Sequence, residues 1–217
     1  MQINSLDKKR GYFVTLEGGE GSGKSTQLGL LEDYLSKGGY DFIFTREPGG
    51  TPISEKIRKI LLGGENTEMC DETEALLFAA ARVQHIKEKI LPAVAAGKTV
   101  VCDRYVHSSL VYQGYARGLG DFVEKVNSYA FENCMPDVTI FLDITPERAF
   151  ARKGGADKDD RMEQSGMDFH KRVYDGYVRV AEKFPDHFVR INADRPVEDV
   201  FEDILSTLEN RGVITRK

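Results

Sequence analysis

Cysteine is scarce in this chain of 217 residues. The three cysteines, Cys70, Cys102 and Cys134, are widely separated and form no CxxC pair. They therefore offer neither the spacing of a metal site nor a disulfide framework. We expect reduced thiols in a cytoplasmic protein, where each cysteine can serve simply as a small buried hydrophobic residue. The four histidines show no metal-ligand spacing either.

Long apolar runs and an excess of positive charge are also missing. The first residues, MQINSLDKKR, lack the apolar core of a signal peptide, and no apolar run reaches the length of a membrane span. We expect a soluble chain with no membrane partner, in which residues 1–10 form a flexible tail. The net charge of −5 argues against a nucleic-acid polymer as the main partner, although a local basic cluster remains open.

What is present is an alternation of strand-like and helix-like segments. Five β-rich runs, most of them continuously apolar, predict strands covered on both faces: Tyr12–Leu16, Phe42–Thr45, Thr99–Cys102, Val138–Leu142 and Phe188–Ile191. The predicted helices are Ser25–Lys37, Glu72–Leu91, Asp121–Cys134, Pro146–Lys153, Met167–Lys183 and Val197–Glu209. This alternation predicts a single α/β domain, residues 1–217, with a parallel sheet and with ligands bound beyond the carboxyl ends of its strands.

The stretch LEGGEGSGKST, residues 16–26, contains a phosphate-binding motif. It fits G-x-x-x-x-G-K-[ST] from Gly18 to Ser25, with a predicted strand before it and an amphipathic helix after it. Glycines let the backbone N–H groups surround phosphate oxygens, Lys24 is expected on the β- and γ-phosphates of a nucleoside triphosphate, and Ser25 on Mg²⁺. The expected nucleotide-binding residues are Gly18, Gly19, Glu20, Gly21, Ser22, Gly23, Lys24, Ser25 and Thr26.

This motif alone leaves the activity open, because GTPases, motors, ATPases and kinases share it. The chain contains no N-K-x-D guanine-reading box, which disfavours a GTPase switch. It is also too short for the additional domains of most motors.

A second informative stretch runs from Thr99 to Gly118. Asp103 ends a predicted strand, where its carboxylate can hold Mg²⁺, and Arg104 follows with a guanidinium suited to a second phosphate. The simpler alternative is a structural ion pair between these two residues. The tyrosines of this stretch suit the wall of a base or sugar pocket, although each alone is more typical of a core.

Four motifs in order, LEGGEGSGKST, TREPGGT, LLFAAAR and DRYVHSSLVYQG, resemble the thymidylate kinase family, whose members phosphorylate dTMP to dTDP. The resemblance covers the chain from about Tyr12 to about Ala193. It implies a three-layer P-loop NTPase fold with a five-stranded parallel sheet flanked by helices, the small-molecule substrates dTMP and ATP, and a homodimer.

The resemblance also implies roles for individual residues. Arg46 and Arg104 lie near the acceptor phosphate, Phe78 stacks on thymine, and Arg82 donates to a thymine carbonyl. Glu20 accepts from the 3′-hydroxyl, and Tyr112 leaves little room for a 2′-hydroxyl. The expected substrate-binding residues are Glu20, Arg46, Pro48, Phe78, Arg82, Arg104, Ser108, Ser109, Tyr112 and Gln113. The apolar residues next to Phe78 in the sequence would by themselves indicate a core residue.

The segment ARKGGADKDDRMEQSG, residues 151–166, is polar and charged and predicts a mobile lid. One branch of the family carries a catalytic arginine in the P-loop, where this chain has Gly21, and the other supplies arginines from the lid. We therefore expect catalytic cations among Arg148, Arg152 and Arg161, beside Lys24 and Arg104, although a solvated charge run is the alternative.

Two other functions stay open from the residues alone. One is a kinase for a different acceptor, dUMP or a nucleoside. The other is a regulatory nucleotide switch that signals through a protein partner. The apolar ALLFAAA segment fits either the core of a monomer or a subunit contact.

Overall fold

One sheet of five parallel strands organises the computed structural model, which describes residues 10–153 and 166–216. The strands lie in the order β2-β3-β1-β4-β5. Their bounds are β1 Phe13–Glu17, β2 Phe42–Arg46, β3 Thr99–Asp103, β4 Val138–Asp143 and β5 Phe188–Asn192. The predicted five-stranded parallel α/β fold is confirmed, and each strand runs one residue past its predicted end.

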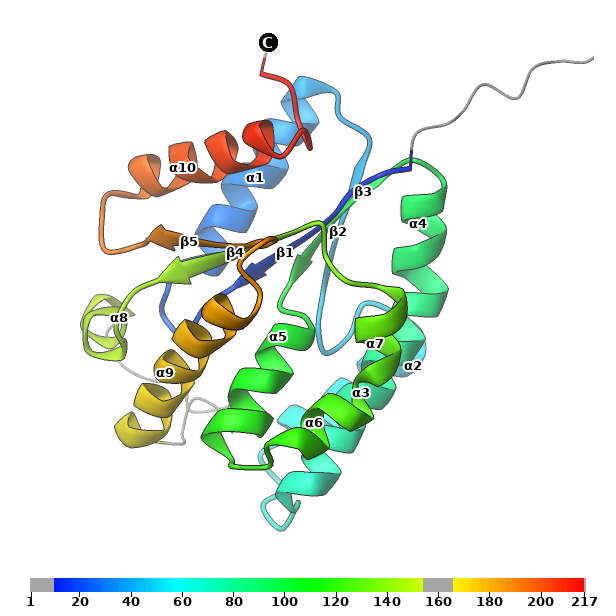
Figure 1. The fold of residues 1–217 in the computed structure, drawn as a ribbon, viewed down its shortest axis with the longest axis vertical. Coiled ribbons are helices and arrows are strands. Elements are labelled where there is room, and N and C mark those ends of the chain that lie inside the picture. The colour runs from blue at the N-terminus through cyan, green and yellow to red at the C-terminus, as the bar shows by residue number, and fades with distance from the viewer. Residues whose placement is uncertain (1–9, 154–165, 217) are drawn as a thin grey trace, which may run out of the picture.

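Helices cover both faces of the sheet. Helices α1 (Lys24–Gly38) and α10 (Val197–Asn210) lie on one face, and α9 (Met167–Lys183) with α5 (Val106–Ser109) lies on the other (Figure 1). Side chains alternate along β4 accordingly: Leu142 joins the core beneath α1 and α10, whereas Phe141 stacks on Tyr177 of α9 with ring centroids 4.7 Å apart. The continuously apolar strands are explained by this double cover.

Helix α8 (Pro146–Lys153) has the predicted bounds. The remaining helical segments differ from the prediction, and they are α2 Pro52–Leu62, α3 Asp71–His85, η1 Ile86–Ile90, α4 Leu91–Ala95, η2 Leu110–Ala116, α6 Asp121–Val126 and α7 Ser128–Asn133. The single helix expected over 72–91 is divided by the π-helical turn η1, and the one expected over 121–134 is divided at Asn127. Helix α2 and the helical segment 106–116 were not predicted.

The register of the sheet brings the two informative motifs together. Leu16, before the P-loop, pairs with Asp103 on β3, and Asp103 also pairs with Arg46 on β2. The carboxyl ends of β1, β2 and β3 therefore meet at one edge, where the topology places a ligand site. Among the described residues, no helix is long and apolar enough to cross a membrane.

Candidate active site

The P-loop connects β1 to α1, and the side chain of Lys24 folds back onto the backbone of this loop. The Nζ atom of Lys24 donates to the backbone oxygens of Gly18 and Gly19, at 3.2 and 3.4 Å. Burial, and then the charge of Arg104, lowers the pKa of Lys24. Lys24 is thus buried, and its ammonium lies where a phosphate can replace the two carbonyl groups as its partner.

Helix α8 lies directly against this loop. A Cβ atom at Gly21 would come within 2.8 Å of the Ala149 carbonyl oxygen, and the φ angle of Gly21 is +71°. Arg152, on the same helix, lines the pocket formed by residues 20–26 and donates to the Ala193 oxygen at 2.7 Å. The side chain of Arg152 on α8 therefore lies beside the P-loop, in the pocket that also includes Gly21, a residue with no side chain of its own.

The other lid arginines are placed differently. Arg148 is largely exposed and pairs with Asp194 at 2.9 Å, and it does not line the P-loop pocket. Arg161 and most of the expected lid, residues 151–166, lie outside the described residues, as does most of the expected N-terminal tail, so those assignments stay predictions.

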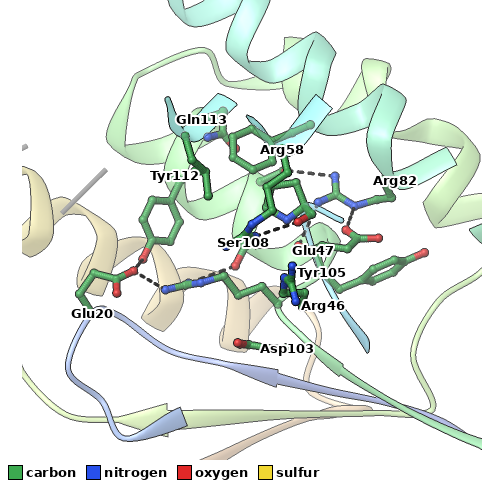
Figure 2. Close-up of a pocket in the computed structure, with 15 residues that line it drawn as sticks. Glu20, Arg46, Glu47, Arg58, Arg82, Asp103, Tyr105, Ser108, Tyr112 and Gln113 are labelled. Carbon is green, nitrogen blue, oxygen red and sulfur yellow. Dashed lines mark hydrogen bonds and ion pairs between the residues drawn. The ribbon is translucent and has the colours of Figure 1, made fainter. Parts of the chain in front are cut away.

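A second pocket adjoins the P-loop. Figure 2 shows its side chains, with Glu20 on one side of the pocket and Arg82 on the opposite side. Its lining brings together all ten predicted substrate residues: Glu20, Arg46, Pro48, Phe78, Arg82, Arg104, Ser108, Ser109, Tyr112 and Gln113, together with Glu47, Arg58, Leu62, Asp103 and Tyr105. Phe78 is half-buried and faces this pocket, so the core interpretation based on its neighbours is incomplete.

Arg104 joins this pocket to the P-loop. Its Nη2 atom donates to Glu20 at 2.5 Å, its Nη1 atom donates to the Tyr177 hydroxyl at 3.1 Å, and its guanidinium lies 5.1 Å from the centre of the Tyr112 ring. Arg104 has a φ angle of +63°, a strained conformation for a residue with a side chain. The ion pair of Arg104 is thus with the P-loop acid rather than with Asp103, the simpler partner considered from the sequence.

Arg82 closes the far side of the pocket and is almost fully buried. Its Nε atom donates to Glu47 at 2.7 Å, and its two Nη atoms donate to Asn127, to Ser109 at 3.0 Å and to the Tyr105 oxygen at 3.2 Å. These four bonds use four of the five N–H groups of a guanidinium. The orientation of Arg82 is therefore fixed before any ligand binds.

Asp103 and Ser25 fit a Mg²⁺ ion. The Oδ1 atom of Asp103 is buried and has no hydrogen-bond partner among the described residues, which is costly for a carboxylate unless a cation or water meets it. Ser25 is exposed at the start of α1. Oxygen donors of this kind are the ligands that Mg²⁺ prefers.

Three buried glutamates of the site were missed from the sequence. Glu17, at the end of β1, accepts from the backbone N–H groups of Tyr105 and Ser108 and from the Ser108 and Tyr177 hydroxyls. Burial raises the pKa of Glu17, and the hydrogen bond from Ser108 opposes this. The available signal was a carboxylate at the end of an otherwise apolar strand, which needs partners there.

The other two glutamates hold predicted binding residues. Glu47 lies between Arg82 and the buried His85, whose Nδ1 atom is 3.0 Å away. Glu74 accepts a hydrogen bond from Gln113. Glu74, Phe78 and Arg82 are spaced four residues apart and so share one face of α3, a pattern that could have identified Glu74.

A P-loop at the carboxyl edge of a parallel sheet, joined through Arg104 to a second polar pocket, defines a P-loop phosphotransferase with separate donor and acceptor sites. A family model described as thymidylate kinase matches residues 16–204. Relatives named thymidylate kinase include one from Bacillus cytotoxicus, 50% identical over 205 residues, and one from Clostridium novyi, 47% identical over 203 residues. The alignments cover 93% and 92% of this chain and 99% of each relative.

The chain belongs to the thymidylate kinase family, which confirms the resemblance seen in its motifs. The reaction of this family is the phosphorylation of dTMP by ATP, with Mg²⁺, on the way to dTTP.

Proposed function

We propose that this chain is a dTMP kinase in which the P-loop holds ATP and the pocket between Glu20 and Arg82 holds dTMP. The observation that carries the proposal is the position of Arg104, whose side chain contacts the P-loop acid Glu20 and also lines the acceptor pocket. A cation at this junction can bring two phosphate groups together despite their mutual repulsion.

Arg104 and Glu20 bind different parts of dTMP. The phosphate of dTMP takes over the guanidinium of Arg104, because a phosphate accepts a bidentate pair of hydrogen bonds. Glu20 is then released to accept a hydrogen bond from the 3′-hydroxyl. Tyr112, whose hydroxyl is 3.5 Å from Glu20, forms the sugar wall, and its ring excludes a 2′-hydroxyl.

Phosphoryl transfer in this site relies on positioning and charge neutralisation. Lys24 leaves the Gly18 and Gly19 carbonyls for the β- and γ-phosphates, and an oxygen of the dTMP phosphate attacks the γ-phosphorus in line with the departing ADP oxygen. Ser25 and Asp103 would hold Mg²⁺, which would supply further charge neutralisation to the phosphates of ATP. We assign the further cation to Arg152 rather than Arg148, because Arg152 lines the P-loop pocket.

The test is ADP release from Mg–ATP with a panel of monophosphates: dTMP, dUMP, CMP, AMP and GMP. We expect dTMP to have the highest kcat/KM. The Arg104→Met variant should lose most of this activity, whereas Arg10→Met, a control that removes an exposed arginine paired with Asp137 away from both pockets, should not. If dTMP supports no more turnover than AMP, CMP or GMP, the acceptor assignment is wrong.

We also propose that the chain works as one domain and as a homodimer through α2 and α3. Three large apolar side chains of these two packed helices are about half exposed, Ile53 at 50%, Ile60 at 47% and Leu76 at 49%. Covering such residues is favourable by about 25 cal/mol per Å². The three free thiols accord with a cytoplasmic protein.

Light scattering after gel filtration tests the dimer. We expect twice the chain mass for the wild type and the monomer mass for Leu76→Glu. Leu30→Glu, an equally apolar exposed position on α1, should remain dimeric. A wild type that runs as a monomer refutes this part of the proposal.

A further inference from the structure

Gln113 of the acceptor pocket is held by a buried acid on the neighbouring helix. Its Nε2 atom donates to the Oε1 atom of Glu74 at 2.8 Å, and both side chains are almost fully buried. The second oxygen of Glu74 is bound by the Nη2 atom of Arg117 at 3.2 Å. The same guanidinium contacts Asp71 at 3.4 Å. Glu74 is therefore held from one side by Arg117 while it contacts Gln113 on the other.

This contact fixes which end of the Gln113 amide faces Glu74. An ion-paired carboxylate has no hydrogen to donate, so only the NH₂ group of Gln113 can bond to it. This argument is chemical and does not depend on how the amide atoms were assigned. Because Gln113 also lines the pocket, its carbonyl oxygen is the end that remains to accept a hydrogen bond from a ligand.

The pyrimidine edge that suits this arrangement carries a hydrogen on N3. Thymine and uracil have an N3–H donor, whereas the N3 atom of cytosine is an acceptor and would face the Gln113 oxygen without a hydrogen between them. The Ser109 hydroxyl can rotate between donor and acceptor roles, so it does not distinguish the two states of N3. Arg82 only donates, so it can distinguish a carbonyl from an amino group at position 4 but cannot accept from an N3–H group. The fixed carbonyl oxygen of the Gln113 amide can thus distinguish a base with an N3–H group from one whose N3 atom carries no hydrogen.

We propose that Glu74 is a positioning residue that sets the orientation of the Gln113 amide and thereby selects acceptors with an N3–H group over cytosine nucleotides. This inference rests on the proposed dTMP site. Glu74 does not contact the substrate itself; it acts through Gln113.

The test compares dTMP with 5-methyl-dCMP, which keeps the methyl group, sugar and phosphate and differs only at the pairing edge. In Glu74→Gln, Arg117 still requires an acceptor, so the new amide turns its oxygen to Arg117 and its NH₂ group to Gln113. The Gln113 amide then flips and presents its NH₂ group to the base. We expect the ratio of kcat/KM for dTMP to that for 5-methyl-dCMP to fall on the order of 10- to 100-fold, the effect of one mispaired buried hydrogen bond.

Two further variants separate positioning from general damage. Asp71→Asn alters the same Arg117 ion pair without contacting Gln113 in the described structure, and it should leave the ratio unchanged. In a Gln113→Leu background, Glu74→Gln should produce no additional change in the ratio. An unaltered ratio in Glu74→Gln, or a full effect that persists without Gln113, overturns the inference.

If Glu74→Gln does not fold, Gln113→Leu alone decides the matter. It must lower the same ratio, and a ratio equal to that of the wild type overturns the inference. Failure of the proposed function looks different, because the wild type itself would then show no preference for dTMP over 5-methyl-dCMP.

Discussion

The carboxylate of Glu17 supports the loop that carries Arg104, and its removal should cost a large part of the stability of the protein. Glu17→Ala leaves the backbone N–H groups of Tyr105 and Ser108 without the oxygen that now accepts from both, at 2.9 and 3.3 Å. An unpaired buried donor costs about 1–3 kcal/mol. Two such donors and the small cavity left by the side chain add to about 3–6 kcal/mol, against a total of about 5–15 kcal/mol for a typical domain.

The Glu17→Gln variant provides the matched comparison. Its remaining carbonyl oxygen can still accept from both backbone donors, and the Ser108 and Tyr177 hydroxyls, now donors to Glu17 at 2.6 and 2.9 Å, can rotate to accept from the new NH₂ group. We expect this variant to lose about 1 kcal/mol. Urea unfolding followed by circular dichroism measures both values, provided that the slope with urea is unchanged.

Glu132→Ala serves as a control for the loss of an acid at an exposed position on α7, and it should change the free energy of unfolding by less than about 0.5 kcal/mol. A loss below about 1 kcal/mol for Glu17→Ala, or equal losses for the alanine and glutamine variants, would refute the hydrogen-bond argument.

Three further predictions concern the donor site, the sugar wall and the core. Arg152→Met should lower kcat on the order of 10³-fold, as loss of an arginine finger does, while Arg148→Met stays within about tenfold of wild type; equal losses would contradict the assignment. Tyr112→Phe should keep the preference for dTMP over its ribonucleotide because the ring remains, and Tyr112→Ala should relax it; kcat/KM for the two acceptors checks this. Burial lowers the pKa of His107 to about 3, so stability that is complete above about pH 6.5 should fall as the pH drops toward 3, with a slope of up to about 1.4 kcal/mol per pH unit. Urea unfolding from pH 7.5 to 5 should show this part of the slope lost in His107→Leu, and an unchanged slope would remove His107 as its source.

The fold was predictable because each of its five strands coincides with a short, mostly apolar run in the sequence. The pair Thr51-Pro52, an N-cap residue followed by proline at the first helical position, begins α2, and the Thr51 hydroxyl accepts from the Ser54 N–H at 3.4 Å. The local sequence therefore contained a signal for α2, although this helix was not among those predicted.

Other features depend on tertiary contacts that local sequence does not specify. The break at Asn127 places its side chain against Arg82, more than 40 residues away in the chain. Most of the site residues could be named in advance because the motifs resemble a family. Glu17, Glu47 and Glu74 could not be named in this way, since their partners are other protein groups rather than the expected ligands.

The close packing of α8 on Gly21 bears on how such enzymes can change during evolution. An arginine placed at position 21 would need a backbone with positive φ to accept a side chain and would push against the Ala149 carbonyl 2.8 Å away. Helix α8 would have to retreat, and Arg152 would move with it. In this structure an arginine at position 21 and Arg152 in its present position therefore exclude each other, so a single substitution at position 21 would not simply add a second cation to the site.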